Sequence, residues 1–588
     1  MSLVAESSAA EPGTAGPQPW YKAIHGPVFW PSAVIIAGFV LFAVIAPDTA
    51  NETITNVQTF IVEKVGWYYT IIVSLFVVFS LWVGLGHYGD IKLSPQDEEA
   101  EFGLGSWFAM LFAAGMGIGL VFWGVAEPLN HFANPKPSLG VDAESNAARF
   151  AGEGGVDATG GPVSNVDIAE QSMVQTFLHW GIHPWAIYVV VGLAVAYMVH
   201  RKGKSISIRW VLQPLLGDKV KGPIGDAVDI AAIVGTLFGV ATSLGFGVTQ
   251  VASGLSFLEI VDEPTDLLLV ILIGAITLVA IVSVVTGVKR GIKYLSNTNM
   301  VIAALIMLFV LFTGPTLYLL RDFVENIGLY LQNLLQLSFD TTANEGPSGA
   351  SWQGSWAMFY WGWWISWAPF VGVFIARISR GRTIREFVAG VLLVPTALSF
   401  LWFTVFGGSG IFRELFGGGG LVTLNEDGDP TVATEGSLFT VLDGLPGGTI
   451  VIGITIILIV LFFVTSSDSG SLVVDMLASG GDPEPPTWSR VFWASMEGLV
   501  AIALLLAGGL AALQMMAIVI ALPFSVVMLA MCVSTLKELR QERAIMLRIQ
   551  RRQQREEITE HVSQNLIEEG LVEPNGGDGS KATAKTSR

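Results

Sequence analysis

Gly115-Met116-Gly117-Ile118-Gly119 places three glycines within one long apolar stretch that runs from Phe108 to Glu127. The stretch is long enough to span a membrane, and each Gly lowers helix propensity by roughly 1 kcal/mol relative to Ala. In lipid, unwound backbone persists only where protein or a water-filled cavity satisfies its polar groups. Two interpretations follow: a broken helix that binds a substrate or ion, or close helix packing through small residues.

The composition of the whole chain predicts an all-α membrane protein. Of its 588 residues, 52% are hydrophobic and only 14% are charged, which excludes an ordinary soluble globule. Apolar stretches of about 20 residues, the length needed to cross a bilayer, recur along the chain. We expect twelve spans, near residues 28–47, 67–87, 104–128, 172–199, 228–258, 267–288, 299–320, 351–378, 386–411, 448–475, 490–508 and 514–536.

The distribution of basic residues predicts the orientation of these spans in the cell membrane. With both termini cytoplasmic, nearly all of the 31 Lys and Arg residues fall inside, and the exceptions are Lys64, Lys136, Arg149, Arg321 and Arg413. Such a bias follows the positive-inside rule. The net charge of −18 arises from acidic loops and tails, and it predicts no nucleic-acid partner.

Motifs for enzymatic chemistry are missing from the sequence. Cys532 is the single cysteine, so neither a disulfide framework nor a CxxC metal site is predicted. No GxxxxGK[ST] loop occurs, so ATP is not expected to drive the protein directly. We therefore expect no enzyme and no resident cofactor.

The order of segments predicts a transporter-like organisation. The third and eighth spans carry unusual residues and are five spans apart, so each could open one of two repeats. We expect a disordered cytoplasmic tail (1–27), two peripheral helices (28–87), a first repeat (88–320), an amphipathic extracellular helix with a linker (321–350), a second repeat (351–536) and a cytoplasmic tail (537–588).

The basic stretch at residues 537–557 predicts a helix that emerges from the membrane. Polybasic segments in this position attract anionic lipid. Two interpretations remain open: a solvated tail that sets topology, or a regulatory sensor of membrane or ionic state.

Two aromatic clusters predict a binding site for a cation. The fourth span carries Trp180, Trp185 and Tyr188, and Pro184 is expected to bend it; the eighth span carries Trp363, Trp364 and Trp367. Boxes of such rings bind quaternary ammonium groups by cation–π attraction, worth roughly 0.5–2 kcal/mol per ring. The alternative is an interfacial aromatic belt, and the neighbouring glycine helix favours the box.

Adjacent hydroxyls in the tenth span predict an ion site. Thr465 and Ser466, together with freed backbone carbonyls, offer hard oxygen ligands that suit sodium, although such residues also hydrogen-bond between helices. Asp468 in the same span is expected to be functional, because a charge there is costly. His179 and His183, spaced i, i+4, could mimic a metal pair, but without a nearby Cys or carboxylate in sequence they are expected to be structural.

These motifs resemble those of the betaine/choline/carnitine transporters. The resemblance rests on the glycine run, on His179-Trp180 through Tyr188, on Tyr360 through Phe370, on Arg377 through Thr383, and on Thr465 through Gly470. The resemblance covers roughly residues 28–536, and the tryptophan motif of the eighth span is highly specific to this family. It implies a LeuT-type fold with two inverted five-helix repeats, spans 3–7 and 8–12, and a homotrimer.

The resemblance also implies the site residues. The substrate cage would consist of Trp180, Trp185, Tyr188 and Trp364, beside the backbone of Gly115, Gly117 and Gly119. The cytoplasmic exit path would be lined by Trp363, Trp367 and Phe359. A sodium ion would bind the backbone oxygens of Ala113, Met116 and Phe462 and the hydroxyls of Thr465 and Ser466.

A second sodium site of the family is in doubt in this chain. It uses two threonines four residues apart near the phenylalanine matched by Phe370; Thr236 matches the first, but the second position is Val240, which offers no oxygen. Water or Ser243, one turn further, would have to substitute.

The residue at position 119 bears on the substrate. Members of the family with Gly there resemble betaine carriers, whereas choline carriers place an acidic residue there. Gly119 therefore favours sodium-coupled uptake of glycine betaine or a related compatible solute, such as ectoine or proline, for osmoprotection by alternating access. The alternatives are sodium-independent exchange of carnitine- or choline-type amines, and an osmosensor in which transport is incidental.

Overall fold

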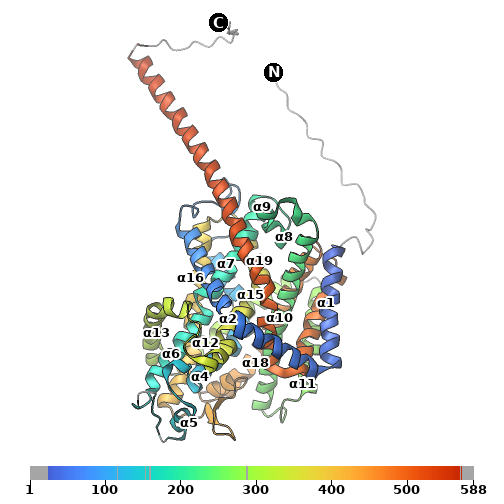
Figure 1. Cartoon of the computed structure of the whole chain (residues 1–588), viewed down its shortest axis with the longest axis vertical. Coiled ribbons are helices and arrows are strands. Elements are labelled where there is room, and N and C mark those ends of the chain that lie inside the picture. Colours follow the sequence, from blue (N-terminus) through green and yellow to red (C-terminus); the bar gives the residue numbers. More distant parts are fainter. Residues whose placement is uncertain are drawn as a thin grey trace. The chain divides into compact units, whose positions relative to one another are not determined.

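The computed structural model describes residues 24–115, 117–152, 154–157, 160–286, 289–569 and 571, with only the backbone described for residues 112–115 and 289–294. The chain divides into two compact units, the first ending at Ser534 and the second beginning at Thr535. Figure 1 follows it from blue to red. The N-terminal tail predicted for residues 1–27 lies almost wholly outside the described residues.

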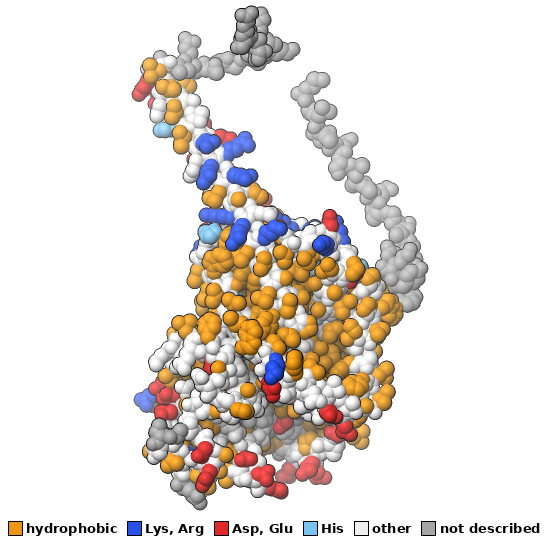
Figure 2. All heavy atoms as spheres, viewed as in Figure 1, with side chains coloured by type: hydrophobic (Ala, Val, Ile, Leu, Met, Phe, Trp, Pro, Cys, Tyr) orange, Lys and Arg blue, Asp and Glu red, His pale blue; other side chains and the backbone are white. Residues whose placement is uncertain are grey.

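Long apolar helices dominate the first unit. Within the described ranges, nine helical stretches have the length and composition to cross a membrane. On the face shown in Figure 2, hydrophobic side chains form a broad band across this unit, and acidic side chains gather beyond one edge of it. The nine stretches are α1 (Gly26–Ile45), α2 (Pro47–Leu85), α6 with α7 (Asn165–Trp180, Ile182–Ala196), α10 (Pro223–Phe257), α11 (Asp266–Thr286), α12 (Lys289–Thr313), α16 (Ile384–Phe416), α18 (Gly448–Ala478) and α19 (Thr487–Glu568).

The other expected spans are interrupted or merged. The third is divided into α3 (Leu104–Gly115) and α4 (Ile118–Ala133). The eighth consists of α14 (Gly346–Gln353), a π-helical turn and α15 (Phe359–Ile378), so the tryptophan motif itself lies in regular helix. The last two run together in α19, whose backbone leaves helical geometry at Gly508 and Gly509. The count of twelve and the inverted repeats therefore stay predictions.

Two predicted helix boundaries were wrong. The second helix was expected at residues 67–87, but α2 begins at Pro47, directly after α1, because a proline suits the first turn of a helix. The seventh span was expected to reach residue 320, but α12 ends at Thr313 before Gly314-Pro315. The predicted amphipathic helix then follows as α13 (Thr316–Ser338), which starts before the expected residue 321.

Short elements connect the long helices. Strands β1 (Val422–Leu424) and β2 (Pro430–Val432) form an antiparallel pair in which Val422 faces Val432. The short helices are α5 (Ala143–Ala151), α8 (Ile208–Val211), α9 (Gln213–Leu216) and α17 (Ser437–Asp443).

The arginine-rich segment of the resemblance fastens one loop to another. Arg380, between α15 and α16, donates two hydrogen bonds of 2.9 Å to Glu98, in the loop between α2 and α3. These bonds lower the pKa of the Glu98 carboxyl below its ordinary value. Gly381 has a φ of +81°, and a Cβ there would lie 2.1 Å from the carbonyl oxygen of Glu99, so only glycine fits. The loop that leads into α3 is thereby held in place.

The core brings the predicted motifs together. Helix α15 packs against α7 and α10, α10 packs against α18, and α16 packs against α4 and α7. The broken helix, both aromatic clusters and the hydroxyl-bearing helix thus share one interior.

Candidate functional site

The predicted break of the third span is present at the glycine run. Helix α3 ends at Gly115, α4 begins at Ile118, and Gly117 between them is extended, with φ −160° and ψ −171°. Met116 lies outside the described residues. Because any residue adopts such an extended backbone, the need for glycine depends on what packs against it.

Gly119 is the glycine that the packing requires. A Cβ at Gly119 would lie 2.5 Å from Cη2 of Trp363 and 3.2 Å from Cη2 of Trp180. At Gly117, by contrast, a Cβ would meet Cη2 of Trp367 at an ordinary 3.7 Å. The missing side chain at position 119 lets rings from α6 and α15 touch the broken helix.

The structure brings the four predicted cage rings together. Trp180 meets Trp364 edge to face, with ring centroids 4.8 Å apart and planes at 73°. Tyr188 lies 5.4 Å from Trp185 and 6.5 Å from Trp364, again edge to face. All four side chains are buried, at 5% exposure or less. Since Trp180 and Trp364 contact each other directly, a trimethylammonium group between them requires one ring to rotate.

The bend in the fourth span lies at Gly181 and not at Pro184, where the sequence predicted it. Gly181, with φ −90° and ψ −134°, separates α6 from α7. Pro184 occupies the first turn of α7, where its missing N–H costs no hydrogen bond. Trp180 and Trp185 therefore belong to different helices, and helical spacing does not set the angle between them.

A layer of stacked rings continues along α15. Trp363 stacks on Trp364 at 4.5 Å and on Phe359 at 5.6 Å, and its Nε1 donates to Oγ of Ser243 at 3.2 Å. Trp367 follows at 6.3 Å from Trp364. The residues predicted for the exit path thus adjoin the cage.

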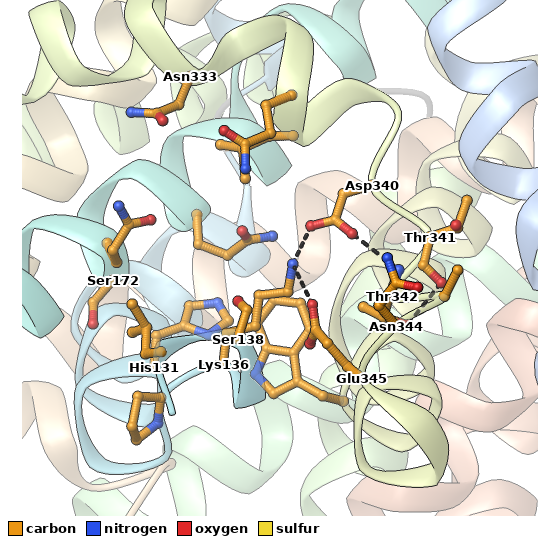
Figure 3. A pocket seen from close by; sticks show the side chains of 18 of the residues that line it. His131, Lys136, Ser138, Ser172, Asn333, Asp340, Thr341, Thr342, Asn344 and Glu345 are labelled. Atoms are coloured by element: carbon orange, nitrogen blue, oxygen red, sulfur yellow. Dashed lines mark hydrogen bonds and ion pairs between the residues drawn. The ribbon is translucent and has the colours of Figure 1, made fainter. Parts of the chain in front are cut away.

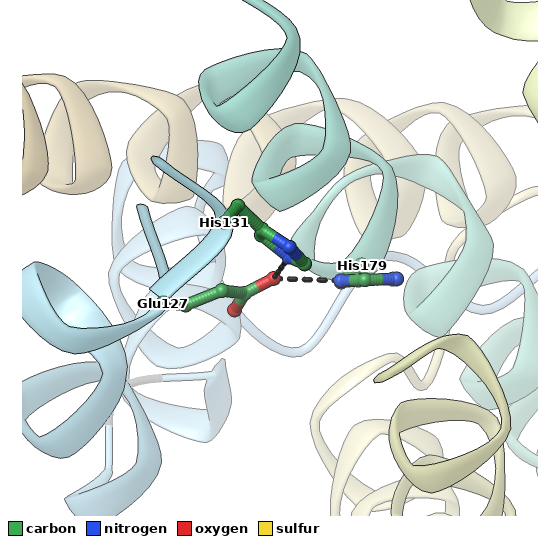
Figure 4. A group of neighbouring side chains, drawn as sticks. All are labelled: Glu127, His131 and His179. Carbon is green, nitrogen blue, oxygen red and sulfur yellow. Dashed lines mark hydrogen bonds and ion pairs between the residues drawn. The ribbon is translucent and has the colours of Figure 1, made fainter. Parts of the chain in front are cut away.

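Glu127 of α4 is fully buried and hydrogen-bonded on both oxygens. Its Oε2 accepts from Nε1 of Trp180 at 2.6 Å and from the hydroxyl of Tyr360. Its Oε1 accepts from Nδ1 of His179 at 2.6 Å and lies 3.4 Å from Nε2 of His131. Figure 4 shows the carboxylate between the two imidazoles. This Glu127 cluster joins α4, α6 and α15.

Glu127, His131 and Tyr360 were not predicted as site residues. One signal was present for Glu127, because an ionisable residue inside a span marks function by default. The same rule selected Asp468, which instead forms an ion pair with Arg490 at 3.3 Å.

Glu127, His131 and His179 are residue types that can bind a metal ion. One ligand atom from each lies within 4.8 Å of the other two. The 2.6 Å from Glu127 to His179 is a hydrogen-bond distance. It is shorter than the ~3.3 Å between two ligands on one zinc ion with bonds near 2.0 Å. Hydrogen bonding therefore explains the cluster. Nε2 of His183 is hydrogen-bonded to Oγ of Ser338 at 2.9 Å, and the structural role expected of His179 and His183 stays a prediction.

A polar cavity of about 560 Å³ lies beside the Glu127 cluster. Lys136 is ion-paired there with Asp340 and Glu345, as Figure 3 shows. Gln175, which lines it, bonds Nε2 of His179 at 3.0 Å. We call this space the His131 cavity; its lining includes His131, Lys136, Ser138, Ser172, Gln175, Asn333, Asp340, Thr341, Asn344, Glu345 and Trp352.

A second cavity, of about 100 Å³, lies beyond the ring layer. We call it the Thr465 cavity; its lining includes Ser296, Asn299, Trp367, Phe370, Phe462, Thr465, Ser466 and Ser469. Oγ1 of Thr465 accepts from Nδ2 of Asn299 at 3.3 Å and contacts the carbonyl oxygen of Phe462 at 3.2 Å. Oδ1 of Asn299 is buried without a hydrogen-bond partner in the described part of the chain.

The predicted sodium ligands are only partly placed. Phe462, Thr465 and Ser466 come together at the Thr465 cavity. Two predicted ligands belong to the third span. Only the backbone of Ala113 is described, and Met116 lies outside the described residues. The sodium site therefore stays a prediction.

The doubtful second sodium site has few free oxygens. Oγ1 of Thr236 is buried and has no partner among the residues described. Val240 packs against Gly470 of α18. The hydroxyl of Ser243 already accepts from Trp363 and donates to the carbonyl oxygen of Gly239 at 3.2 Å, so it is a poor substitute.

Comparison with known proteins gives a consistent result. The family model described as BCCT, betaine/carnitine/choline family transporter, matches residues 27–154 and 158–544. The chain is 49% identical to an uncharacterised transporter of Mycobacterium tuberculosis, over 88% of this chain and 83% of that protein. It is 45% identical to the glycine betaine transporter OpuD of Bacillus subtilis (88% and 94% covered), and 40% identical to a glycine betaine/proline/choline transporter of Vibrio parahaemolyticus (88% and 91%).

Replacing Gly119 by Ala is expected to displace the ring of Trp363, because the new Cβ would lie 2.5 Å from it. Overpacking of this kind typically costs about 1–3 kcal/mol. Near-ultraviolet circular dichroism should show an altered tryptophan signal, and the melting temperature should fall. Gly117→Ala is the matched control and should change neither. Equal spectra for Gly119→Ala and the unaltered protein would contradict the packing role.

Proposed function

Since the chain belongs to the betaine/carnitine/choline family of transporters, we propose that it takes up glycine betaine or a related compatible solute, coupled to sodium. The observation that carries the proposal is the contact between Gly119 and the rings of Trp180 and Trp363. Backbone amides at the start of α4, which lack partners within the helix, therefore lie beside two tryptophan rings. A zwitterion has a negative end that suits the amides and a positive end that suits the rings.

The two ends of glycine betaine suit the two parts of the site. The trimethylammonium group attracts the faces of Trp180, Trp185, Tyr188 and Trp364, at roughly 0.5–2 kcal/mol per ring. The carboxylate can accept hydrogen bonds from backbone N–H groups at the start of α4, where the helix dipole is positive. Choline has no carboxylate for these amides, and an acidic side chain at position 119 would collide with Trp363.

The Thr465 cavity supports sodium coupling. It gathers the hydroxyls of Thr465 and Ser466 with the unpartnered Oδ1 of Asn299, which are hard oxygen ligands. A sodium-independent exchanger would need a fixed positive charge there. None of the lining residues that the structure describes is Lys or Arg.

The two cavities support alternating access. The Glu127 cluster, which lies beside the His131 cavity, is hydrogen-bonded to Trp180. Trp367, which lines the Thr465 cavity, adjoins Trp364. The ring layer thus lies between two spaces. Transport would open one side of this layer while the other stays closed.

The wider assembly also belongs to this proposal. We propose a homotrimer in the cell membrane with cytoplasmic termini, in which the arginines of α19 contact anionic lipid. Support comes from the exposed apolar side chains on α13, which call for a protein or lipid partner. They are Leu317, Leu320, Val324, Leu331 and Leu335. Osmotic activation through the tail is the second role proposed for the basic segment.

Uptake into a transport-deficient strain tests the proposed function. Cells expressing the chain are expected to accumulate radiolabelled glycine betaine in sodium medium, and much less when potassium replaces sodium. Unlabelled ectoine, proline, choline and carnitine serve as competitors that define the substrate range. Failure to accumulate betaine or any competitor would overturn the proposal, and equal uptake in both media would overturn sodium coupling.

Trp364→Leu is expected to weaken betaine binding about tenfold or more, because it removes a cage ring worth up to about 2 kcal/mol. Tryptophan fluorescence titration of the purified protein measures the dissociation constant. Trp493→Leu removes an equally buried tryptophan that packs against Phe29, outside the cage. That control should keep the original affinity; the same affinity in Trp364→Leu would count against the cage.

The double change Thr465→Ala with Ser466→Ala should raise the sodium concentration that gives half-maximal uptake about tenfold, since two oxygen ligands are lost. The measurement is a sodium titration of betaine uptake. Thr455→Ala is the control, because its hydroxyl lies on the same helix and donates to the carbonyl oxygen of Val451 in its own turn. An unchanged sodium requirement in the double variant would exclude these hydroxyls as ligands.

A further inference from the structure

The Glu127 carboxylate is buried beside Trp180, and no Lys or Arg among the described residues pairs with it. Its exposure is 0%, and Trp180, Tyr360 and His179 all donate to it. The basic side chains near it in the described ranges are the imidazoles of His131 and His179, and none is Lys or Arg. A buried charge is costly, so its retention calls for a function.

The hydrogen bonds indicate that both imidazoles are neutral. With the amide nitrogen of Gln175 facing it at 3.0 Å, Nε2 of His179 is the acceptor, and Nδ1–H donates a hydrogen bond to Oε1 of Glu127. Neither ring nitrogen of His131 has a hydrogen-bond partner among the described residues, so a charged ring would leave two N–H groups unsatisfied where a neutral ring leaves one. Three donors converge on Glu127 and favour its ionised form, and with that form the cluster carries one net negative charge.

This charge is coupled directly to a cage ring. Oε2 of Glu127 lies 2.6 Å from the indole nitrogen of Trp180, whose ring meets Trp364 at a centroid distance of 4.8 Å. An anionic acceptor on the N–H shifts electron density into the indole and makes its face more negative. Cation–π attraction is electrostatic, so it grows with that negative potential.

Tyr360 links the same carboxylate to the second ring. Its hydroxyl donates to Oε2 of Glu127, and its ring stacks on Trp364 at 5.9 Å. Trp364 in turn donates from Nε1 to the backbone oxygen of His179 at 3.0 Å. One carboxylate therefore orients both rings that would face the ammonium group.

We propose that Glu127 is a specificity-determining residue that acts through the Trp180 indole. Its charge makes the cage prefer a permanently cationic head group over a neutral group of the same shape. The inference rests on the proposed function, because it assumes that the cage binds glycine betaine.

The test compares two ligands that differ only in this charge. Glycine betaine and 3,3-dimethylbutyrate share a carboxylate and three methyl groups, but the second has carbon in place of the quaternary nitrogen. Dissociation constants for both are measured by tryptophan fluorescence on the purified full-length protein. Their ratio is the preference for the cation.

Glu127→Gln should reduce that preference about tenfold while binding of 3,3-dimethylbutyrate is largely kept. The glutamine oxygen can still accept from Trp180 and Tyr360, and its amide can face His179 once that imidazole changes tautomer. Glu497→Gln is the matched control: Glu497 is equally buried, but it bonds Ser467 of α18 at 2.9 Å and touches no cage ring. Its ratio should equal that of the unaltered protein.

A second variant covers the case in which Glu127→Gln does not fold. Trp180→Phe keeps a ring but removes the N–H that connects it to Glu127, so the preference should fall there as well. An unchanged ratio in either variant, or equal loss of affinity for both ligands, would overturn the inference and leave Glu127 as a purely structural residue. If the unaltered protein does not bind glycine betaine, the proposed function fails first.

Discussion

The arrangement of the site depends on one close approach, that of the Gly119 backbone to the rings of Trp363 and Trp180. These tryptophans belong to α15 and α6, and a single methyl group at position 119 would push at least one of them away. The contact needs a helix start without a side chain, and the extended Gly117 just before it turns that start toward the rings. A break in a membrane helix is tolerated only where protein covers it, and here tryptophans provide that cover.

The ring layer is fixed by its hydrogen bonds as much as by stacking. A buried indole N–H needs an acceptor. Trp180 finds one in Glu127, Trp363 in Ser243, and Trp364 in the backbone of His179. Nε1 of Trp367, by contrast, has no partner among the described residues, although it is equally enclosed. Trp367, which lines the Thr465 cavity, is therefore held by fewer hydrogen bonds than the other three rings.

Sequence reasoning identified the local motifs, and the family resemblance grouped rings from two spans into one cage, but the hydrogen bonds between distant segments were missed. The glycine run, the tryptophan motif and the Thr465-Ser466 hydroxyls are each contiguous, so composition and spacing were enough to find them. The bond from Trp180 to Glu127 spans 53 residues, and that from Trp363 to Ser243 spans 120. No periodicity pairs such positions. The bend was misplaced for a related reason: Pro184 attracts attention, but a proline in a first turn leaves a helix straight, and the change of direction falls on Gly181.

The chemistry of the donors explains why a carboxylate, and not an amide, occupies position 127. An indole N–H, a phenol O–H and an imidazole N–H converge on the same two oxygens, and a carboxylate is the side chain that only accepts. A glutamine would present an NH₂ to one of these donors and would force the His179–Gln175 pair to rearrange. These hydrogen bonds offset part of the free-energy cost of burying the carboxylate. Its negative charge, which no Lys or Arg among the described residues neutralises, can attract a cationic substrate. The Glu127 carboxylate therefore serves both the packing of the helices and the proposed choice of substrate.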